Sequence, residues 1–251
     1  METESYTPGH SKNAAEFMAK RSIHTHGEFF LPYLKPGLSV LDCGCGPGSI
    51  TLSIARLVSP GTVDGVDFGT SQIEQAKASA LRAGTANAAF QTANCYSLPF
   101  PGATFDRVFS HALVEHLSDP VRALTEFFRV LRPGGVVGVC SPDWGGFLLA
   151  PPSADLSAAI SAYTALQRKN GGDVEVGRKL GAYLQRSGFA NVNMAARYEC
   201  YTSRPLIGEY LALQLENQSD SKSAEVLRNW SRLDGGMFAQ CWVACTAHKL
   251  P

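Results

Sequence analysis

Three glycines alternate with other residues at positions 44, 46 and 48, directly after the short apolar run 38–41. Because glycine has no side chain, the backbone of such a loop can approach a ligand, and its N–H groups favour a negative or polar group. A dinucleotide-binding fingerprint would need glycine at position 49, where this chain has Ser49. Asp42, just before the loop, would repel a pyrophosphate and attract a cationic amine. The loop therefore fits a zwitterionic ligand better than a dinucleotide, with a plain strand-to-helix turn as the alternative.

A second acid, Asp67, ends the run 62–67, which has the pattern of a buried strand. A carboxylate at the end of such a strand offers two acceptor oxygens, enough for both hydroxyls of a ribose. The simpler alternative is that Asp67 only caps a turn before Gly69. Together with the glycine loop and Asp42, we interpret Asp67 as a ribose-binding residue.

These residues need a scaffold, and the apolar pattern predicts strands alternating with helices. Strands are expected at 38–41, 62–67, 88–92, 105–110, 136–140, 189–200 and 238–247. Helices are expected at 11–31, 49–58, 119–131, 153–170, 180–186 and 204–233, with a further one capped by Thr70 or Ser71. Asp119-Pro120 has the form of a helix cap followed by proline at the first helical position. The alternation predicts a mostly parallel, Rossmann-like α/β sheet of seven strands with helices on both faces.

The overall composition excludes several classes of protein. Lys plus Arg and Asp plus Glu are 22 each in 251 residues, so no basic field favours nucleic acid or a membrane surface. No apolar run approaches the length of a membrane helix, and the polar start 1–17 is unlike a signal peptide. The seven cysteines suit reduced thiols in a cytoplasm, and they lack the spacing of a zinc site, so no metal is expected.

The chain resembles the class I S-adenosylmethionine-dependent methyltransferases. The segment Val-Leu-Asp-Cys-Gly-Cys-Gly-Pro-Gly at 40–48 is similar to motif I of that family. The segments 93–100, 105–110, 114–117 and 129–135 resemble the later conserved stretches of the family. The branch that looks most similar contains quinone-biosynthesis and other small-molecule methyltransferases.

The resemblance implies S-adenosylmethionine as the cofactor. Its site would be made by Tyr6, Asp42, Gly44, Cys45, Gly46, Gly48, Asp67, Phe68, Gln72, Asn94, Cys95 and Ser110. The loop would hold the methionine part, Asp67 the ribose, and Phe68 the adenine ring. Asn94 and Cys95 would flank the adenine edge, although the family commonly has an acid in place of Asn94.

The reaction itself needs mainly a nucleophile held in line with the methyl group. Where the acceptor must lose a proton, His111 is the first candidate base and His24 or His26 the next. Trp144, Phe147 and Tyr210 are candidates for binding the acceptor, with ordinary packing as the alternative.

We expect a single domain, 1–251, with a cofactor-binding core at 30–140. The segments 1–30, 141–176 and 204–233 lie outside the regular alternation and are expected to form a lid, with Tyr6, His10 and Arg21 as its N-terminal candidates.

The most favoured function is methyl transfer to O, N or C of a small-molecule, partly aromatic or quinone-like metabolite, as in secondary metabolism. After the fourth expected strand the chain has Ser110-His111-Ala112-Leu113 and not the Asn/Asp-Pro-Pro-aromatic motif of amide or adenine methyltransferases. The alternatives are a cofactor-binding cyclase or regulator that transfers no methyl group and, less favoured, an NAD-dependent oxidoreductase. The acceptor, the attacked atom and the oligomeric state stay open.

Overall fold

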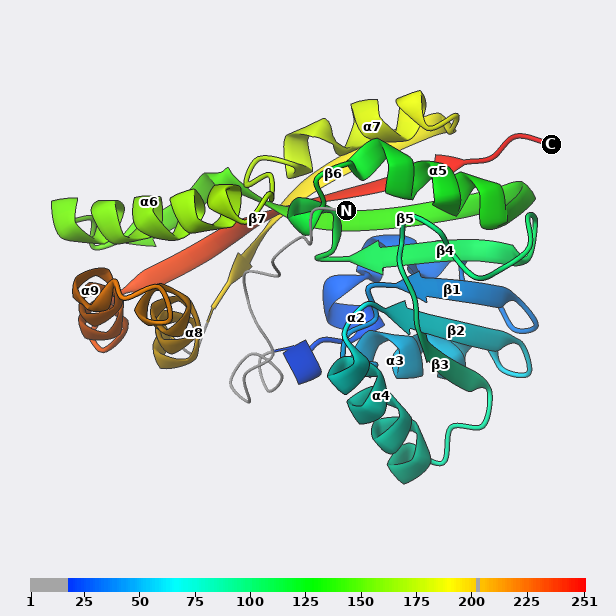
Figure 1. Cartoon of the computed structure of the whole chain (residues 1–251), viewed down its shortest axis with the longest axis horizontal. Helices are drawn as coiled ribbons and strands as arrows, with labels where there is room; N and C mark the ends of the chain where they lie inside the picture. The colour runs from blue at the N-terminus through cyan, green and yellow to red at the C-terminus, as the bar shows by residue number, and fades with distance from the viewer. Residues whose placement is uncertain (1–17, 202–203) are drawn as a thin grey trace.

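The computed structural model describes residues 18–201 and 204–251. In this part of the chain the strands form one seven-stranded sheet in the order β3-β2-β1-β4-β5-β7-β6 (Figure 1). They are β1 (Ser39–Cys43), β2 (Thr62–Asp67), β3 (Ala88–Thr92), β4 (Phe105–His111), β5 (Leu131–Ala150), β6 (Ala190–Cys200) and β7 (Met237–His248). Neighbours from β3 to β5 pair in parallel, whereas β7 runs antiparallel to both β5 and β6. The predicted Rossmann-like, mostly parallel sheet is therefore confirmed.

Helices cover both faces of this sheet. They are α2 (Ile23–His26), α3 (Ser49–Val58), α4 (Thr70–Ala83), α5 (Pro120–Val130) and α7 (Leu180–Arg186), with the 3₁₀ helices η1 (Glu28–Tyr33), η2 (Val114–His116) and η3 (Gly177–Lys179). Val108 and Phe109 are neighbours in β4 but belong to different core clusters, because alternate side chains of a strand face opposite ways. The cluster of Val108 contains Phe127 of α5, and that of Phe109 contains Ile54 of α3.

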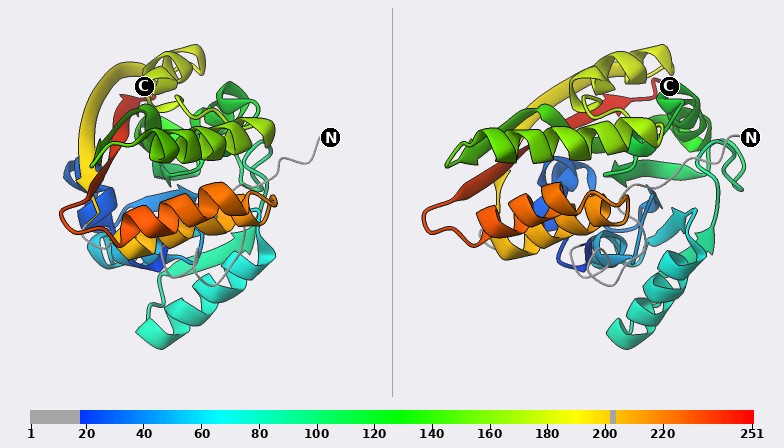
Figure 2. Two further views of the ribbon diagram at one scale, coloured as in Figure 1. Left: turned by 90° about the vertical axis from the view of Figure 1, so that its left-hand side faces the viewer. Right: turned by 60° about the vertical axis from the view of Figure 1, so that its left-hand side comes forward.

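The remaining helices form a separate layer, here called the helical block, beyond one end of the sheet (Figures 1 and 2). The block consists of α6 (Ala154–Lys169), α8 (Arg204–Glu216) and α9 (Ser221–Ser231). These helices pack around a second core that includes Trp144 from β5 and Phe238 from β7. The ends of β5 and β7 thus contribute side chains to the core of the helical block. Within 18–201 and 204–251, no helix is both long enough and apolar enough to cross a membrane.

The predicted fifth strand, 136–140, was much too short. Strand β5 runs from Leu131 to Ala150, through the Pro- and Gly-rich stretch that we expected to be irregular. It can do so because β7 pairs with it antiparallel as far as Ala150, with one irregularity between Asp143 and Leu148. A long antiparallel partner overrides the local preference of proline and glycine for turns.

Two predictions of local helical structure were wrong. The described part of 11–31 contains α2 and η1, with a break at Gly27, where a Cβ atom would collide with Ile23. Helix α4 has Gly69 as its N-cap and no capping side chain, so neither Thr70 nor Ser71 caps it. By contrast, the cap at Asp119 is confirmed, since its carboxylate accepts the backbone N–H of Arg122 at 3.1 Å.

Candidate active site

The three loop glycines all have positive φ, but for different local reasons. A Cβ on Gly44 (φ +78°) would lie 3.0 Å from Leu113, and one on Gly48 (φ +82°) would lie 3.0 Å from Ala76. Gly46 (φ +52°) is different, because the nearest atoms to its Cβ position lie 3.9 Å away, on Gln72 and Met18. Close packing thus requires Gly44 and Gly48, whereas a Cβ on Gly46 would make only ordinary van der Waals contacts with Gln72 and Met18, so its left-handed φ is what favours glycine there.

Asp67 lies between the glycine loop and the start of α4. Its carboxylate accepts the backbone N–H groups of Gly46 and Gly69, both at 2.9 Å. Each carboxylate oxygen has a second lone pair, so the group can still accept hydrogen bonds from a ligand. The neighbouring Phe68 is 76% exposed, which is unusual for a large apolar side chain and leaves its ring available for stacking on a flat ligand.

Asp42 lies beneath the loop and not at its surface. Its side chain is buried, and Thr51 of α3 donates a hydrogen bond of 2.6 Å to it. Burial raises the pKa of Asp42 to about 7, against the opposing effect of the Thr51 hydrogen bond. Asp42 therefore makes a supporting contact between β1 and α3, and the attraction of a ligand amine that we expected of it stays a prediction.

The other predicted cofactor residues surround the same end of the sheet. Asn94 uses its side-chain oxygen to accept the backbone N–H of Tyr96 at 2.9 Å, so its amide N–H groups are the part left for an adenine edge. Gln72 and Cys45 are buried, and Cys95 is half-buried.

Ser110 is fully buried at the end of β4, and its hydroxyl has no hydrogen-bond partner among the described residues. Tyr6 and His10 lie outside the described residues.

A narrow cavity of about 50 Å³ lies between the end of the sheet and the helical block, and its walls are mostly aromatic. We call it the aromatic cavity. Its lining includes Met18, Arg21, Ala112, Glu115, His116, Trp144, Tyr163, Gln167, Tyr201, Tyr210, Phe238, Gln240 and Trp242. Met18 also lies against the glycine loop, where its carbonyl accepts a hydrogen bond of 3.2 Å from Ser49. The cavity therefore adjoins the proposed cofactor site.

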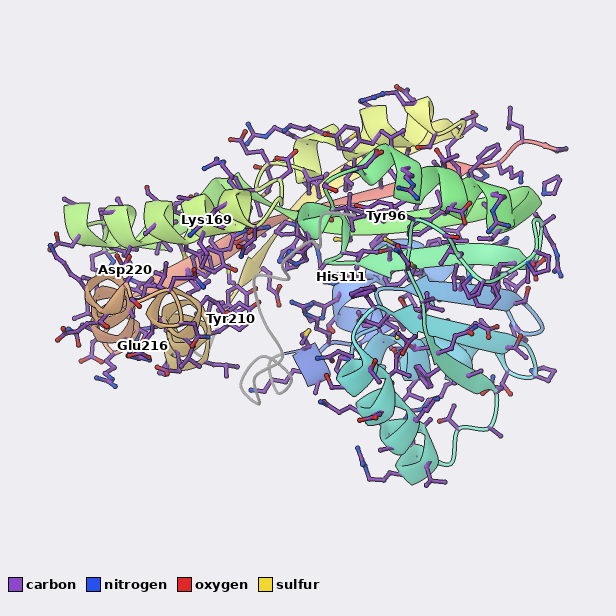
Figure 3. All side chains as sticks on the ribbon, viewed as in Figure 1. Tyr96, His111, Lys169, Tyr210, Glu216 and Asp220 are labelled. Atoms are coloured by element: carbon purple, nitrogen blue, oxygen red, sulfur yellow. The ribbon has the colours of Figure 1, made fainter. Side chains whose placement is uncertain are left out.

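Of the three predicted acceptor-binding residues, two line this cavity. They are Trp144 from β5 and Tyr210 from α8, and Tyr210 is labelled in Figure 3. Phe147 is not among the lining residues; its ring packs 6.3 Å from those of Trp144 and Phe238. Phe147 thus supports the wall and does not form it.

His111, predicted as the base, does not line the aromatic cavity. Its ring stacks on Trp242 with 4.7 Å between ring centres and meets the edge of His26 at 5.4 Å, and its nitrogens bond to none of the described residues. Burial, followed by the nearby charge of Arg21, holds the pKa of His111 well below its usual value.

The two alternative bases lie outside the cavity as well. His26 bonds to Thr25 at 2.7 Å and to Glu199 at 3.1 Å, and His24 is exposed.

Glu115 is the residue that the sequence reasoning missed. Glu115 is one of the residues that line the cavity, its side chain is almost completely buried, and its carboxylate accepts a hydrogen bond of 2.9 Å from Ser141. Burial raises its pKa to about 7, opposed by its hydrogen bonds and by Arg21. The signal in the sequence was its position, five residues after the predicted strand 105–110 and next to the apolar Val114, where a buried acid would be costly without a role.

Comparisons with known proteins identify part of the chain. A family model described as a methyltransferase domain matches residues 40–135. Residues 40–135 are thus similar to a methyltransferase domain. This match confirms the resemblance stated from the sequence.

Relatives of the methyltransferase domain include an uncharacterized methyltransferase of Schizosaccharomyces pombe, 38% identical over 53% of this chain and 50% of that protein. A demethylmenaquinone methyltransferase of Lactococcus lactis is 40% identical over 41% of each chain. The chain spans about half the length of the first curated relatives it matches. The solved YcgJ protein of Bacillus subtilis has the same fold, with a TM-score of 0.66 at 20% identity over 89% of this chain and 97% of that one.

Proposed function

We propose that the protein transfers a methyl group from S-adenosylmethionine to O, N or C of a small-molecule metabolite. The observation that carries this proposal is the position of Gly46, which is bound to Asp67 beside the exposed Phe68 and lies next to Met18, a residue of the aromatic cavity wall. A ligand held by the loop would thus present one end to a cavity with mostly aromatic walls, where a small acceptor could be positioned for methyl transfer.

The residues fit the proposed cofactor in position and chemistry. The N–H groups of the glycine loop suit the methionine carboxylate, the Asp67 carboxylate suits the ribose hydroxyls, and Phe68 offers an apolar face for adenine. Asn94 and Cys95 follow β3 and are assigned to the adenine edge. When bound, S-adenosylmethionine supplies a methyl group already activated by its sulfonium charge. The remaining task of the chain is to position the acceptor and exclude water.

The acceptor site is assigned to the aromatic cavity and to the segments around it. Three parts of the chain contribute to its lining: Met18 and Arg21 from 1–30, Trp144 and Tyr163 from 141–176, and Tyr210 from 204–233. We therefore keep 1–251 as one domain in which these segments close over the core at 30–140. A cavity this narrow suits a small molecule, and aromatic walls suit a partly aromatic or quinone-like one. All seven cysteines are free, in keeping with the reduced cytoplasm expected from the sequence.

The test combines binding with transfer. Calorimetry should show micromolar binding of S-adenosylmethionine and of its demethylated product, and none of NAD. Incubation with methyl-labelled S-adenosylmethionine and a metabolite extract should then give a labelled small molecule. Cofactor binding without any labelled product would contradict methyl transfer and favour a cyclase or regulator, and binding of NAD alone would contradict the cofactor assignment.

A further inference from the structure

The aromatic cavity contains one carboxyl group placed where a reacting proton could be received. Glu115 lies in η2, on the turn after β4, and its side chain is held by Ser141 of β5 at 2.9 Å. Its backbone carbonyl accepts the N–H of Asp173 at 2.9 Å, which fixes the turn itself. Both the side chain and the backbone of Glu115 are therefore held in place. A buried acid held in this way in a cavity wall has the geometry of a general base.

The same cavity contains a guanidinium group. Arg21 lines the cavity, with its guanidinium carbon 5.7 Å from the centre of the Trp242 ring. Its positive charge acts to lower the pKa of Glu115, Tyr201 and Tyr210, although burial is the largest effect on each and raises it. A phenol in this cavity would experience the same field, which stabilises a phenolate and disfavours a cationic amine.

The cavity also has unused hydrogen-bonding capacity. Gln240 donates from its side-chain nitrogen to the carbonyls of Asp143 and Cys241, but its side-chain oxygen is buried with no partner among the described residues. Likewise the indole N–H of Trp242 has no partner in the described part of the chain. Buried polar atoms of this kind are costly unless a ligand satisfies them.

We propose that the methyl acceptor is an aromatic hydroxyl compound, a phenol or a hydroquinone, and that Glu115 is the catalytic base that removes its proton. This inference rests on the proposed function. The hydroxyl proton passes to the Glu115 carboxylate, and an electron pair of the oxygen forms the new O–CH₃ bond. The S–CH₃ bond breaks, and its electron pair stays on sulfur as a neutral thioether. Glu115 then releases the proton to solvent.

The charge state of Glu115 agrees with this role. Its pKa is raised to about 7 by burial, near the pH at which a base works best. The charge of Arg21 and the hydrogen bond from Ser141 of β5 both lower the pKa of Glu115. The Glu115 charge in turn raises the pKa of Cys140 in β5 and of Tyr210 in α8. The His116 Nε2 atom lies 3.8 Å from the Glu115 carboxylate. Turnover of a phenol should therefore rise with pH through about 7.

The decisive experiment compares two probes, phenol and 4-nitrophenol, with labelled S-adenosylmethionine at mildly alkaline pH. Phenol, with a pKa of about 10 like tyrosine, needs a base there, whereas 4-nitrophenol is already largely ionised. Glu115→Gln should lower kcat/KM for phenol by roughly 100-fold or more and leave 4-nitrophenol within a few-fold of the unmodified protein. Glu225→Gln, at an exposed site on α9, is the matched control and should change neither. An equal loss for both probes would show that Glu115 only shapes the cavity.

A second readout does not depend on turnover. When 4-nitrophenol binds beside S-adenosylhomocysteine, its absorbance reports the pH midpoint of its ionisation, and Arg21→Gln should move that midpoint upward because the guanidinium charge stabilises the phenolate. An unchanged midpoint in Arg21→Gln would overturn the inference. If the extract yields a labelled amine while neither phenol binds, methyl transfer stands and the phenol proposal fails. If S-adenosylmethionine itself does not bind, the proposed function fails.

Discussion

Gly46 donates its backbone N–H to the Asp67 carboxylate across 2.9 Å, and this bond joins the loop after β1 to the turn after β2. The residue assigned to the ribose therefore also sets the position of the loop assigned to the methionine part. Loss of Asp67 should consequently affect both ends of a bound cofactor, through one side chain.

Asp67→Ala should weaken binding of S-adenosylmethionine by about 2–4 kcal/mol, because charge-assisted hydrogen bonds to the ligand and the bond to Gly46 are both lost. Calorimetry measures the change, and thermal unfolding shows that the variant is folded. Asp155→Ala, at an exposed position on α6, is the control and should bind normally. Unchanged affinity in a folded Asp67→Ala variant would show that Asp67 only stabilises its turn and does not bind the cofactor.

Gly46→Ala should abolish most cofactor binding, because the added methyl group would occupy the space beside Gln72 and Met18 into which a ligand must fit. Gly84 is a matched control, since its φ of +62° is also left-handed and its Cβ position is open. Both substitutions should cost about 1–2 kcal/mol of stability from backbone strain. Equal affinity for S-adenosylmethionine in the two variants would show that Gly46 faces no ligand.

The pH dependence of stability should reveal Glu115. The folded chain holds the proton of this carboxyl more tightly, with a pKa raised from 4.5 to about 7 chiefly by burial. Its contribution to stability is therefore complete below about pH 4.5 and is lost as the pH rises through about 7. Relative to the unmodified protein, Glu115→Gln should gain about 3 kcal/mol between pH 4 and pH 8, since a pKa difference of one is worth about 1.4 kcal/mol.

Denaturant unfolding at the two pH values measures this gain. Glu225→Gln should follow the unmodified protein at both values. Asp42, which has a pKa raised in the same direction, remains in all three proteins, so it leaves the comparison unchanged. Parallel stability curves for Glu115→Gln and the unmodified protein would contradict the raised pKa.

The helix caps give a prediction about the fold. Asp119→Ala should destabilise the protein by about 1 kcal/mol, because the N–H of Arg122 loses its acceptor at the start of α5. Ser71→Ala, at the position wrongly predicted as a cap, should change stability by less than about 0.5 kcal/mol. Thermal unfolding of the two variants makes the comparison, and an equal loss in both would contradict the difference between the two helix starts.

The sheet was predictable because its signals are local. The apolar runs at 38–41, 62–67 and 88–92 each lie within one strand or next to it, and the glycine loop between β1 and α3 carries its own turn chemistry. The length of β5 was not predictable, because its second half is a strand only through pairing with β7, about a hundred residues later in the sequence. Pro142, in that half of β5, locally favours a turn over a strand.

The candidate site likewise has a part that the local sequence predicts and a part that depends on distant residues. Asp67 and the glycines follow strand ends and could be assigned from position alone. The choice between His111 and Glu115 could not, because it depends on which side chain Trp242 covers, and Trp242 comes from the last strand. Both side chains are buried, but the His111 ring is covered by that indole ring and does not line the cavity, whereas Glu115 lines it.

The continuous course of β5 from the sheet into the cavity wall affects how acceptor preference can change among related chains. Its first half pairs with β4 inside the sheet, and its second half carries Trp144 into the cavity wall without any intervening hinge. The matched family region ends at residue 135, near the start of this strand, and most of the residues that line the cavity lie after it. Exchanging residues 142–242 between related chains should therefore alter acceptor preference while the donor site is inherited intact.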